Sequence, residues 1–373
     1  MPGSDYVGLF GYLGSGSEIH DLGVEYIDIT GYDFVGGLVG DNNEGALMSC
    51  YATGWVSGHS CVGGLVGFNQ EGPLNSCHAT VQVMGDESIG GLVGFNIDSK
   101  ITSCYVTGNQ GDVFGEVFGN NEVGGLVGTN LHGTLIFCHA KPWIVNGGDY
   151  IGGLVGHNWG TLMSCYASGW ADGDDRIGGL VGQNYGRVFS CYATVYASGY
   201  RWVGGLVGIT SFHNTYICSS YATGPVYGNK SVGVLVGASW GTVTACFWDT
   251  ETSGQSGSAG GEGKTTAEMQ DINTFLDAGW DFVGERVNGP NDIWRICVNG
   301  IHYPKLWWEF ADGDLECPDG VDFIDFTAFS SAWYSNDTPT DNWNLHCDIS
   351  KPPDGVIDEQ DLNIFCENWL EGK

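Results

Sequence analysis

An internal repeat constrains this fold more than any other feature of the sequence. The block Val-Gly-Gly-Leu-Val-Gly, or a near copy of it, recurs nine times between residue 6 and about residue 248. Its last glycine recurs at spacings of 29, 27, 27, 34, 28, 26, 26 and 29 residues. Each copy continues through a polar turn to a short segment that ends in Ser-Cys-Tyr-Ala-Thr-Gly or a variant. Repeats of this length stack on one another and bury a common core.

The composition of the repeat predicts a right-handed parallel β-solenoid of about nine coils. Short segments rich in Val, Leu, Tyr and Thr, separated by Gly and Asn, are typical of strands and turns. A coil of about 27 residues suits three short strands and three tight corners, stacked about 4.8 Å apart. We attribute the glycines to corners with positive φ and to close backbone approach. A leucine-rich repeat would need a helix, and a propeller about 40 residues per blade.

Two side-chain columns recur at fixed positions in the repeat. We interpret the asparagines as buried turn amides that hydrogen-bond to the backbone of neighbouring coils, as stacked Asn side chains do, rather than as a binding stripe. The cysteines have no second Cys or His at metal-ligand spacing, and stacked Cβ atoms about 4.8 Å apart exceed the ~3.8 Å of a disulfide. We therefore predict free, buried thiols. The columns are Asn42, Asn69, Asn96, Asn130, Asn158 and Asn184, and Cys50, Cys77, Cys104, Cys138, Cys165, Cys191 and Cys246, with Ser220 in the slot that Cys218 misses by two residues.

The charge of the chain limits its partners. Twelve Lys and Arg face 44 Asp and Glu, which leaves a net charge of −32. This charge argues against nucleic acid and anionic membranes as partners. No apolar run reaches the ~18 residues of a membrane span, so no span is predicted. The residues after Met1 do not resemble a signal peptide, so we expect an extracellular protein whose signal peptide was removed or lies outside this sequence.

The repeat offers little for catalysis, and we predict a binding or structural protein rather than an enzyme. Its few basic residues do not recur in register beside an acidic pair, as a polysaccharide-cleaving groove would require. Three aromatic residues at one turn, Trp159, Tyr185 and Trp240, could stack on the sugar rings of a glycan. The alternative, which we favour, is that they pack on one another along the solenoid.

Composition changes after the repeat, so we divide the chain into a solenoid (1–250), a cap (251–310) and a tail (311–373). Residues 251–264 are rich in Gly and Ser and predict a flexible loop. A capping-box pattern from Thr265 to Glu268 predicts a short helix over 265–276. The aromatic stretch that follows would cover the open strand edges at the end of the solenoid.

The tail predicts calcium binding. Residues 311–373 carry 15 Asp and Glu against two Lys, in two acidic loops that each lead into an amphipathic helix, 326–333 and 362–369. Ca²⁺ takes six to eight oxygen ligands, which such loops supply. The first loop starts at either Asp312 or Asp314. The candidate ligands are Asp312, Asp314, Asp319, Asp322 and Asp325 in the first loop, and Asp348, Ser350, Asp354, the Val356 carbonyl, Asp358 and Asp361 in the second.

Four cysteines outside the column, Cys297, Cys317, Cys347 and Cys366, are the candidates for oxidation in an extracellular setting.

These motifs also resemble known families. The unit Val-Gly-Gly-Leu-Val-Gly…Cys-Tyr-Ala-Thr-Gly resembles the GLUG-motif repeat of secreted bacterial proteins over about two-thirds of the chain. Phe247-Trp248-Asp249-Thr250 and Tyr303-Pro304-Lys305-Leu306-Trp307-Trp308 resemble the segment that closes such arrays. The tail resembles a type I dockerin, which implies Ca²⁺ and a cohesin-like or cell-surface partner.

Three hypotheses remain open from the sequence. The first is an extracellular scaffold or adhesin tethered through its Ca²⁺-dependent tail. The second is a filament in which the solenoid stacks head-to-tail on itself, because the coil at residues 6–11 has no visible cap. The third is a carbohydrate-active β-helix enzyme.

Overall fold

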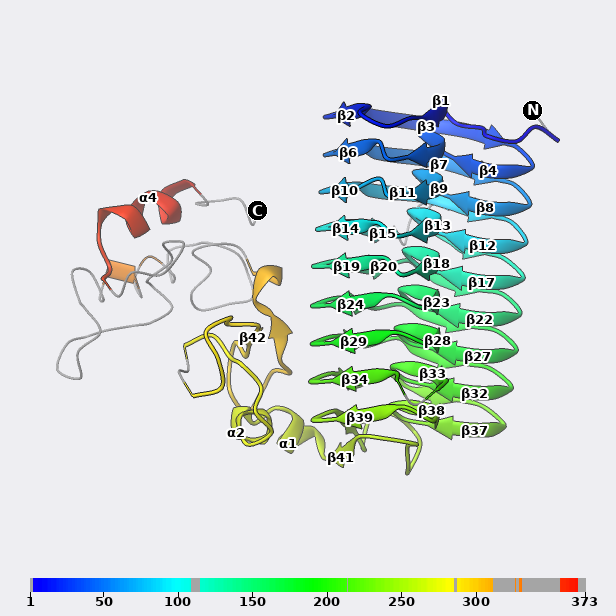
Figure 1. Ribbon diagram of the computed structural model, residues 1–373. Coiled ribbons are helices and arrows are strands. Elements are labelled where there is room, and N and C mark those ends of the chain that lie inside the picture. Colours follow the sequence, from blue (N-terminus) through cyan, green and yellow to red (C-terminus); the bar gives the residue numbers. More distant parts are fainter. Residues whose placement is uncertain are drawn as a thin grey trace. The chain divides into compact units, whose positions relative to one another are not determined.

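The computed structural model describes residues 3–108, 115–212, 214–284, 287–310, 326, 329–330 and 356–367. Two compact units divide the chain, residues 1–266 and 267–373. The first unit is a parallel β-solenoid of nine coils, as the repeat predicts (Figure 1).

The coils of the solenoid form four parallel sheets, to all of which every coil after the first contributes strands. Sheet 1 contains β1 (Phe10–Leu13), β5 (Val39–Asn43), β9 (Val66–Gln70), β13 (Val93–Ile97), β18 (Val127–Leu131), β23 (Val155–Asn158), β28 (Val181–Asn184), β33 (Val207–Thr210) and β38 (Val236–Ser239). Sheet 2 contains β2 (Glu18–His20), β6 (Ala46–Met48), β10 (Leu74–Asn75), β14 (Lys100–Thr102), β19 (Thr134–Ile136), β24 (Thr161–Met163), β29 (Arg187–Phe189), β34 (Tyr216–Cys218) and β39 (Thr242–Thr244).

The other two sheets complete each turn of the chain. Sheet 3 contains β3 (Gly23–Thr30), β7 (Tyr51–Ser57), β11 (His78–Met84), β15 (Tyr105–Thr107), β16 (Val117–Phe118), β20 (His139–Lys141), β21 (Ile144–Asn146), β25 (Tyr166–Ala167), β26 (Trp170–Asp172), β30 (Tyr192–Ala193), β31 (Tyr196–Ser198), β35 (Tyr221–Ala222), β36 (Val226–Tyr227), β40 (Phe247–Asp249) and β41 (Glu262–Lys264). Sheet 4 contains β4 (Asp33–Gly36), β8 (Ser60–Gly63), β12 (Glu87–Gly90), β17 (Asn121–Gly124), β22 (Asp149–Gly152), β27 (Asp175–Gly178), β32 (Arg201–Gly204) and β37 (Lys230–Gly233).

The prediction of three strands per coil is wrong. The Val-Gly-Gly-Leu-Val-Gly block does not form one strand, because its middle two residues make a corner between two strands. In the third coil, β8 ends at Gly63 and β9 begins at Val66, so Gly64 and Leu65 make the turn between sheets 4 and 1. The same division recurs in the other copies of the block from β4 onward. The chain therefore bends once more per coil than the apolar pattern indicates.

The glycines of this corner are needed for close packing and not for positive φ. A Cβ atom at Gly63 would collide with the Val66 carbonyl oxygen, and one at Gly64 with the Gly91 carbonyl oxygen of the next coil. Positive φ occurs instead at non-glycine residues such as Cys61 (φ 53°) and Ser76 (φ 53°). The expected close approach is therefore confirmed at this corner, whereas positive φ is found at only a few other described glycines of the solenoid, such as Gly54 (φ 128°) and Gly169 (φ 109°).

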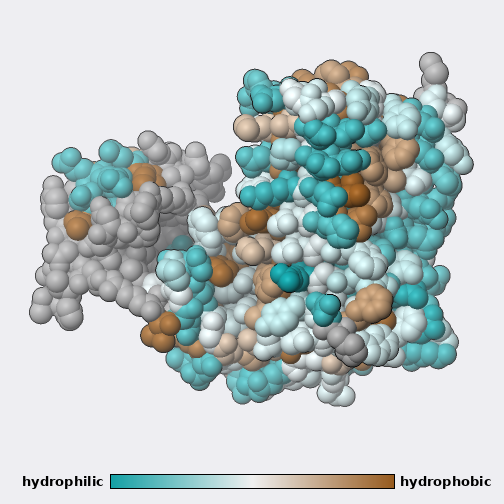
Figure 2. Space-filling model, in the orientation of Figure 1, coloured by the Kyte–Doolittle hydropathy of each residue, from teal (hydrophilic) through white to brown (hydrophobic). Residues whose placement is uncertain are grey.

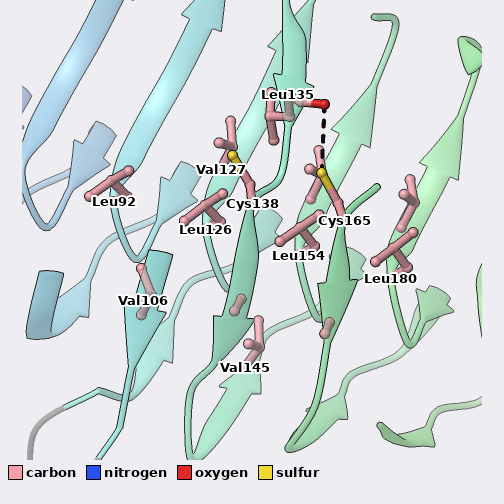
Figure 3. Packing of buried hydrophobic residues seen from close by; sticks show 14 of the residues in the cluster. Leu92, Val106, Leu126, Val127, Leu135, Cys138, Val145, Leu154, Cys165 and Leu180 are labelled. Carbon is pink, nitrogen blue, oxygen red and sulfur yellow. Dashed lines mark hydrogen bonds between the residues drawn. The ribbon is translucent and has the colours of Figure 1, made fainter. Parts of the chain in front are cut away.

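The core is a set of apolar columns that run along the solenoid. Leu92, Leu126, Leu154 and Leu180 take the same place on successive coils, and all are fully buried (Figure 3). Full burial of a leucine side chain stabilises the fold by about 1.5–3 kcal/mol. Because every coil contributes such residues, each coil is stable only when a neighbour covers it.

The asparagine column is a buried, stacked ladder as predicted, but its bonds to the next coil join side chain to side chain, and its backbone partner lies in its own turn. Asn69 Nδ2 donates to Asn96 Oδ1 of the next coil (2.8 Å) and to the Gly72 carbonyl of its own turn (2.8 Å). The pattern continues from coil to coil at 2.7–2.9 Å as far as Asn184. At the start of the ladder, Leu13 pairs in register with Asn42, and the buried Asn42 Oδ1 has no hydrogen-bond partner in the described residues.

The cysteine column consists of free thiols, as predicted. Each sulfur donates to the carbonyl oxygen two residues earlier, as Cys138 does to Ile136 (3.3 Å). Ser220 takes the same place, since its hydroxyl donates to the Cys218 carbonyl (2.8 Å). Burial is the main cause that raises the pKa of the Cys138 thiol well above its ordinary value.

Residues 253–264, which we call the strap, lie against the last coil, so the prediction of a flexible loop is wrong. Val226 N donates to the Ser253 carbonyl (2.9 Å) and Val234 N to the Gly257 carbonyl (3.0 Å). Beyond these contacts, β41 pairs in parallel with β40. The last coil would otherwise leave its backbone donors unpaired, and the strap supplies their acceptors.

The second unit has a small aromatic core of its own. Trp280 and Trp294 are buried with their ring centroids 4.6 Å apart, and Phe275 packs on Trp280. The helix predicted over 265–276 is two short helices. The remaining elements are α1 (Thr266–Met269), α2 (Ile272–Leu276), the antiparallel pair β42 (Trp294–Arg295) and β43 (Lys305–Leu306), η1 (Trp307–Glu309) and α4 (Glu359–Glu367).

Candidate binding surface

The three aromatic residues predicted at one turn lie on the outside of the solenoid, immediately after the ladder position. Trp159 and Tyr185 follow Asn158 and Asn184, and their rings stack in parallel with centroids 4.0 Å apart and planes 8° apart. Phe212, which was not predicted as part of this site, lies next to Tyr185 with ring centroids 5.2 Å apart and its plane tilted by 43°. No ring contact of Trp240 is found within the described residues. We call Trp159, Tyr185, Phe212 and Trp240 the turn row.

The turn row combines mutual packing with exposure. Phe212 is 64% exposed, Trp240 55% and Trp159 40%. The face shown in Figure 2 likewise mixes hydrophilic and apolar residues over the solenoid. The predicted packing of these rings on one another is therefore present for Trp159 and Tyr185 and, among the described residues, is not found for Trp240, whose place next to Tyr185 is taken by Phe212, while large parts of the row still face solvent.

A chain of polar contacts holds Trp159 in place. Its indole N–H donates to His157 Nε2 (2.9 Å), and His157 Nδ1 lies 3.0 Å from Glu122 Oε1. Since Nε2 accepts the indole N–H, it is the Nδ1 side of the ring that faces Glu122. The ring also stacks on Tyr150, with centroids 5.4 Å apart. Trp159 is thus oriented by residues from three earlier strands, β17, β22 and β23.

Glu122 anchors this network as a fixed acceptor. Burial alone would raise the pKa of its carboxyl, but hydrogen bonds from His157, Ser88 and Thr129 outweigh burial and lower the pKa to about 2. Ser88 Oγ is 2.6 Å from Glu122 Oε2. A carboxylate that stays ionised in this way cannot act as a general acid near neutral pH. Its role here is to position His157.

Two further aromatic rows run along sheet 3, and the sequence analysis did not propose either as a site. Trp170, Tyr196 and Tyr227 stack with centroid distances of 4.7 and 5.0 Å. This row could have been found in the sequence, because three consecutive repeats each carry an aromatic residue at nearly the same position of the repeat. The second row is longer and consists of Tyr51, His78, Tyr105, His139, Tyr166, Tyr192 and Tyr221, with centroids 4.8–5.0 Å apart.

The histidines of the longer row are neutral. Burial is the main cause that lowers the pKa of His139 to about 3, and nearby Lys141 adds to the effect. Burial also lowers the pKa of His78. These imidazoles therefore act as flat rings in the stack rather than as acids or bases near pH 7.

Most of the predicted calcium ligands lie outside the described residues. These are Asp312, Asp314, Asp319, Asp322, Asp325, Asp348, Ser350 and Asp354. Of the other three, Val356 is exposed, and Asp358 and Asp361 are placed at the start of α4. Asp361 Oδ2 accepts from Asp358 N (2.9 Å), and Asp358 Oδ1 accepts from Gln360 N (2.8 Å). Within the described residues, no three His, Cys, Asp or Glu side chains come together as a metal site.

Comparison with known proteins identifies the repeat. The family model of the GLUG motif matches residues 85–110 and 147–171, and each match spans about one coil. The chain contains GLUG repeats. It is also 45% identical over 71 residues to a "Putative Gly-rich membrane protein" of Evansella cellulosilytica. That match covers 17% of this chain and only 8% of the relative.

No solved structure matches the chain. Among the helices of the described residues, none is long and apolar enough to cross a membrane. GLUG repeats folded as a β-solenoid fit a structural or binding protein.

Proposed function

We propose that the protein is an extracellular scaffold, not an enzyme, which binds its ligand on the outer face of the solenoid and is tethered through its tail. The turn row is the observation that supports this function. Exposed apolar side chains that gather on one part of a protein surface mark interaction sites. Because the asparagine ladder and the core columns lock each coil to the next, the rings of the row keep a fixed spacing.

Neutral glycans are the ligands that we propose for the turn row. Binding sites for small ligands combine aromatic side chains with a few well-placed polar groups, and here Gln183 and His157 lie beside the rings. The net charge of −32 repels anionic polymers and so favours uncharged ones. Phe212 and Trp240 carry the most exposed rings and would make the largest contacts.

Binding of the full chain to insoluble cellulose, chitin and xylan tests this part of the proposal. We expect the chain to be retained on at least one of them, and the double variant Trp159→Ala/Trp240→Ala to lose at least tenfold in affinity. Trp143→Ala is the matched control, because Trp143 is similarly exposed but lies outside the row. Absence of binding to all three polymers, or an equal loss in the control, would contradict a glycan site in the turn row.

For the tail we propose a calcium-dependent tether to a cohesin-like or other cell-surface partner. Two similar acidic loops, each followed by a predicted helix, support the proposal. The second of these helices, predicted over 362–369, corresponds to α4 (Glu359–Glu367), which Asp358 directly precedes. The name of the relative, a membrane protein, agrees with a location at the cell surface.

Calorimetric titration of the full chain with Ca²⁺ tests the tether. We expect binding with a Kd of about 10⁻⁴–10⁻³ M, as in other extracellular calcium modules. Asp354→Asn should remove one site, whereas Glu359→Gln should leave both sites unchanged. Glu359 is a suitable control because it is an exposed neighbouring acid outside the predicted ligand set. No heat of binding at millimolar Ca²⁺, or an equal effect of both variants, would mean that the acidic loops are ordinary turns.

A further inference from the structure

The two ends of the solenoid differ in how the core is covered. At the first coil, Leu9 is 57% exposed, whereas its equivalent Leu38 in the second coil is fully buried. Apolar atoms are visible at this end in Figure 2. At the last coil, Leu235 is fully buried, and the strap crosses it so closely that a Cβ at Gly261 would meet its side chain. In the described part of the chain, β1, β2 and β3 each pair with one strand only.

The strap imitates the coil that would come next. Between neighbouring coils, the amides of the Leu-Val pair both donate to the leucine carbonyl of the following coil, as Leu206 N and Val207 N do to Leu235 O (2.9 and 3.0 Å). At the last coil, Leu235 N and Val236 N donate instead to the Ser258 hydroxyl (3.2 and 2.9 Å). One hydroxyl thus replaces one carbonyl.

The first coil carries the group that Ser258 replaces. Its Phe10 pairs in register with Val39, so the residue before it, Leu9, occupies the leucine position of the repeat. Ile19 likewise pairs with Leu47, which shows that the first coil follows the same path as the others. The open side of this coil therefore has the shape and the acceptors that the last coil needs.

The charges at the two ends are complementary. One side-chain column along sheet 4 is acidic at the first coil, where Asp5 lies next to Asp33 and accepts a hydrogen bond from Asp33 N. At the last coil the same column is basic, because Arg201 pairs in register with Lys230. Arg201 forms an ion pair with Asp175, whereas Lys230 is exposed and lies over the Tyr200 ring. A second copy stacked in register would place its Asp5 beside Lys230. Opposite charges that meet across an interface fix its register.

We propose that the last coil is a docking surface for the first coil of a second copy of this chain, and that the strap closes this surface in the single chain. The strap and the incoming coil use the same amides, so only one of them can be bound at a time. Displacement of the strap would then give head-to-tail assemblies that grow by one chain at a time.

The experiment opens the strap in the full chain and measures the mass in solution. Ser258→Lys puts a charged side chain against Leu235 and Val236 and should displace the strap. Ser256→Lys makes the same change two residues away at an exposed position and serves as control. Light scattering should give the mass of one chain for the wild type and the control. For Ser258→Lys, the mass should increase with protein concentration, and circular dichroism should show unchanged β-structure.

A charge swap identifies the surfaces involved. In the Ser258→Lys chain, Lys230→Glu should weaken assembly at least threefold at low salt, and adding Asp5→Lys should restore it. A Ser258→Lys chain that stays folded and single would overturn the proposal, as would a wild type that already assembles. Failure of Asp5→Lys to restore assembly would show that the two ends do not meet.

Discussion

The asparagine ladder allows a quantitative prediction, because its members differ in how many hydrogen bonds they make. Asn130 accepts from Asn96 (2.9 Å) and donates to Asn158 (2.9 Å) and to the Gly133 carbonyl (3.2 Å). Asn42 donates to Asn69 (2.7 Å) and to the Gly45 carbonyl (2.8 Å), and its Oδ1 accepts nothing. Both side chains are fully buried.

Each hydrogen bond contributes about 1 kcal/mol net to stability. Asn130→Ala should therefore lower the free energy of unfolding by about 3 kcal/mol and Asn42→Ala by about 2 kcal/mol. The measurement is urea-induced unfolding, followed by hydrogen exchange of the coils on each side, because solenoids can unfold locally from their ends. Equal losses of unfolding free energy for the two variants would refute the reasoning that Asn42 contributes less because its Oδ1 accepts no hydrogen bond.

A double-mutant cycle tests the same reasoning more directly. Leu13→Asn places a donor in register with Asn42 Oδ1, although it gives up the burial of a leucine. In that background the cost of Asn42→Ala should rise by about 1 kcal/mol. A coupling energy of zero would show that the unpaired oxygen does not limit the stability of this end.

Three further predictions concern packing, reactivity and pH. Gly64→Ala should destabilise the chain by about 1–3 kcal/mol, because its Cβ meets a backbone carbonyl, whereas Gly257→Ala, where nothing lies within 4 Å, should leave the Tm unchanged. Alkylation with mass mapping should modify the exposed Cys366 in the folded chain, and should modify the buried Cys138 and Cys165 only after unfolding, even at pH 9, because burial raises their pKa values. Glu122 has a lowered pKa of about 2 in the folded chain, so its stabilising contribution is present above the ordinary pKa of 4.5 and is lost between pH 4.5 and pH 2. The stability difference between the wild type and Glu122→Gln, measured by urea-induced unfolding, should shrink over that range.

The stacked columns could be predicted from the sequence because in-register coils turn a spacing of about 27 residues into direct contact. The repeat spacing alone was enough to predict that Asn69 lies next to Asn96, and that Cys138 lies next to Cys165. The predicted packing of Trp159 on Tyr185 follows from the same rule. Contacts that cross from one column to another do not have this period. The bond from His157 to Glu122 joins two strands of different sheets at an offset of 35 residues, and only the corner between those sheets brings the two side chains together.

The ends of the solenoid could not be predicted for a related reason. Gly- and Ser-rich residues indicate a flexible loop when they are considered alone, because they bury little apolar surface. The strap is ordered by what it covers: Leu235 N and Val236 N would be buried without an acceptor, and each such amide costs about 1–3 kcal/mol. Small residues suit this position because Gly260 crosses the Val243 side chain too closely for a Cβ. A segment whose composition predicts disorder thus gains its structure from the unpaired donors of the coil before it.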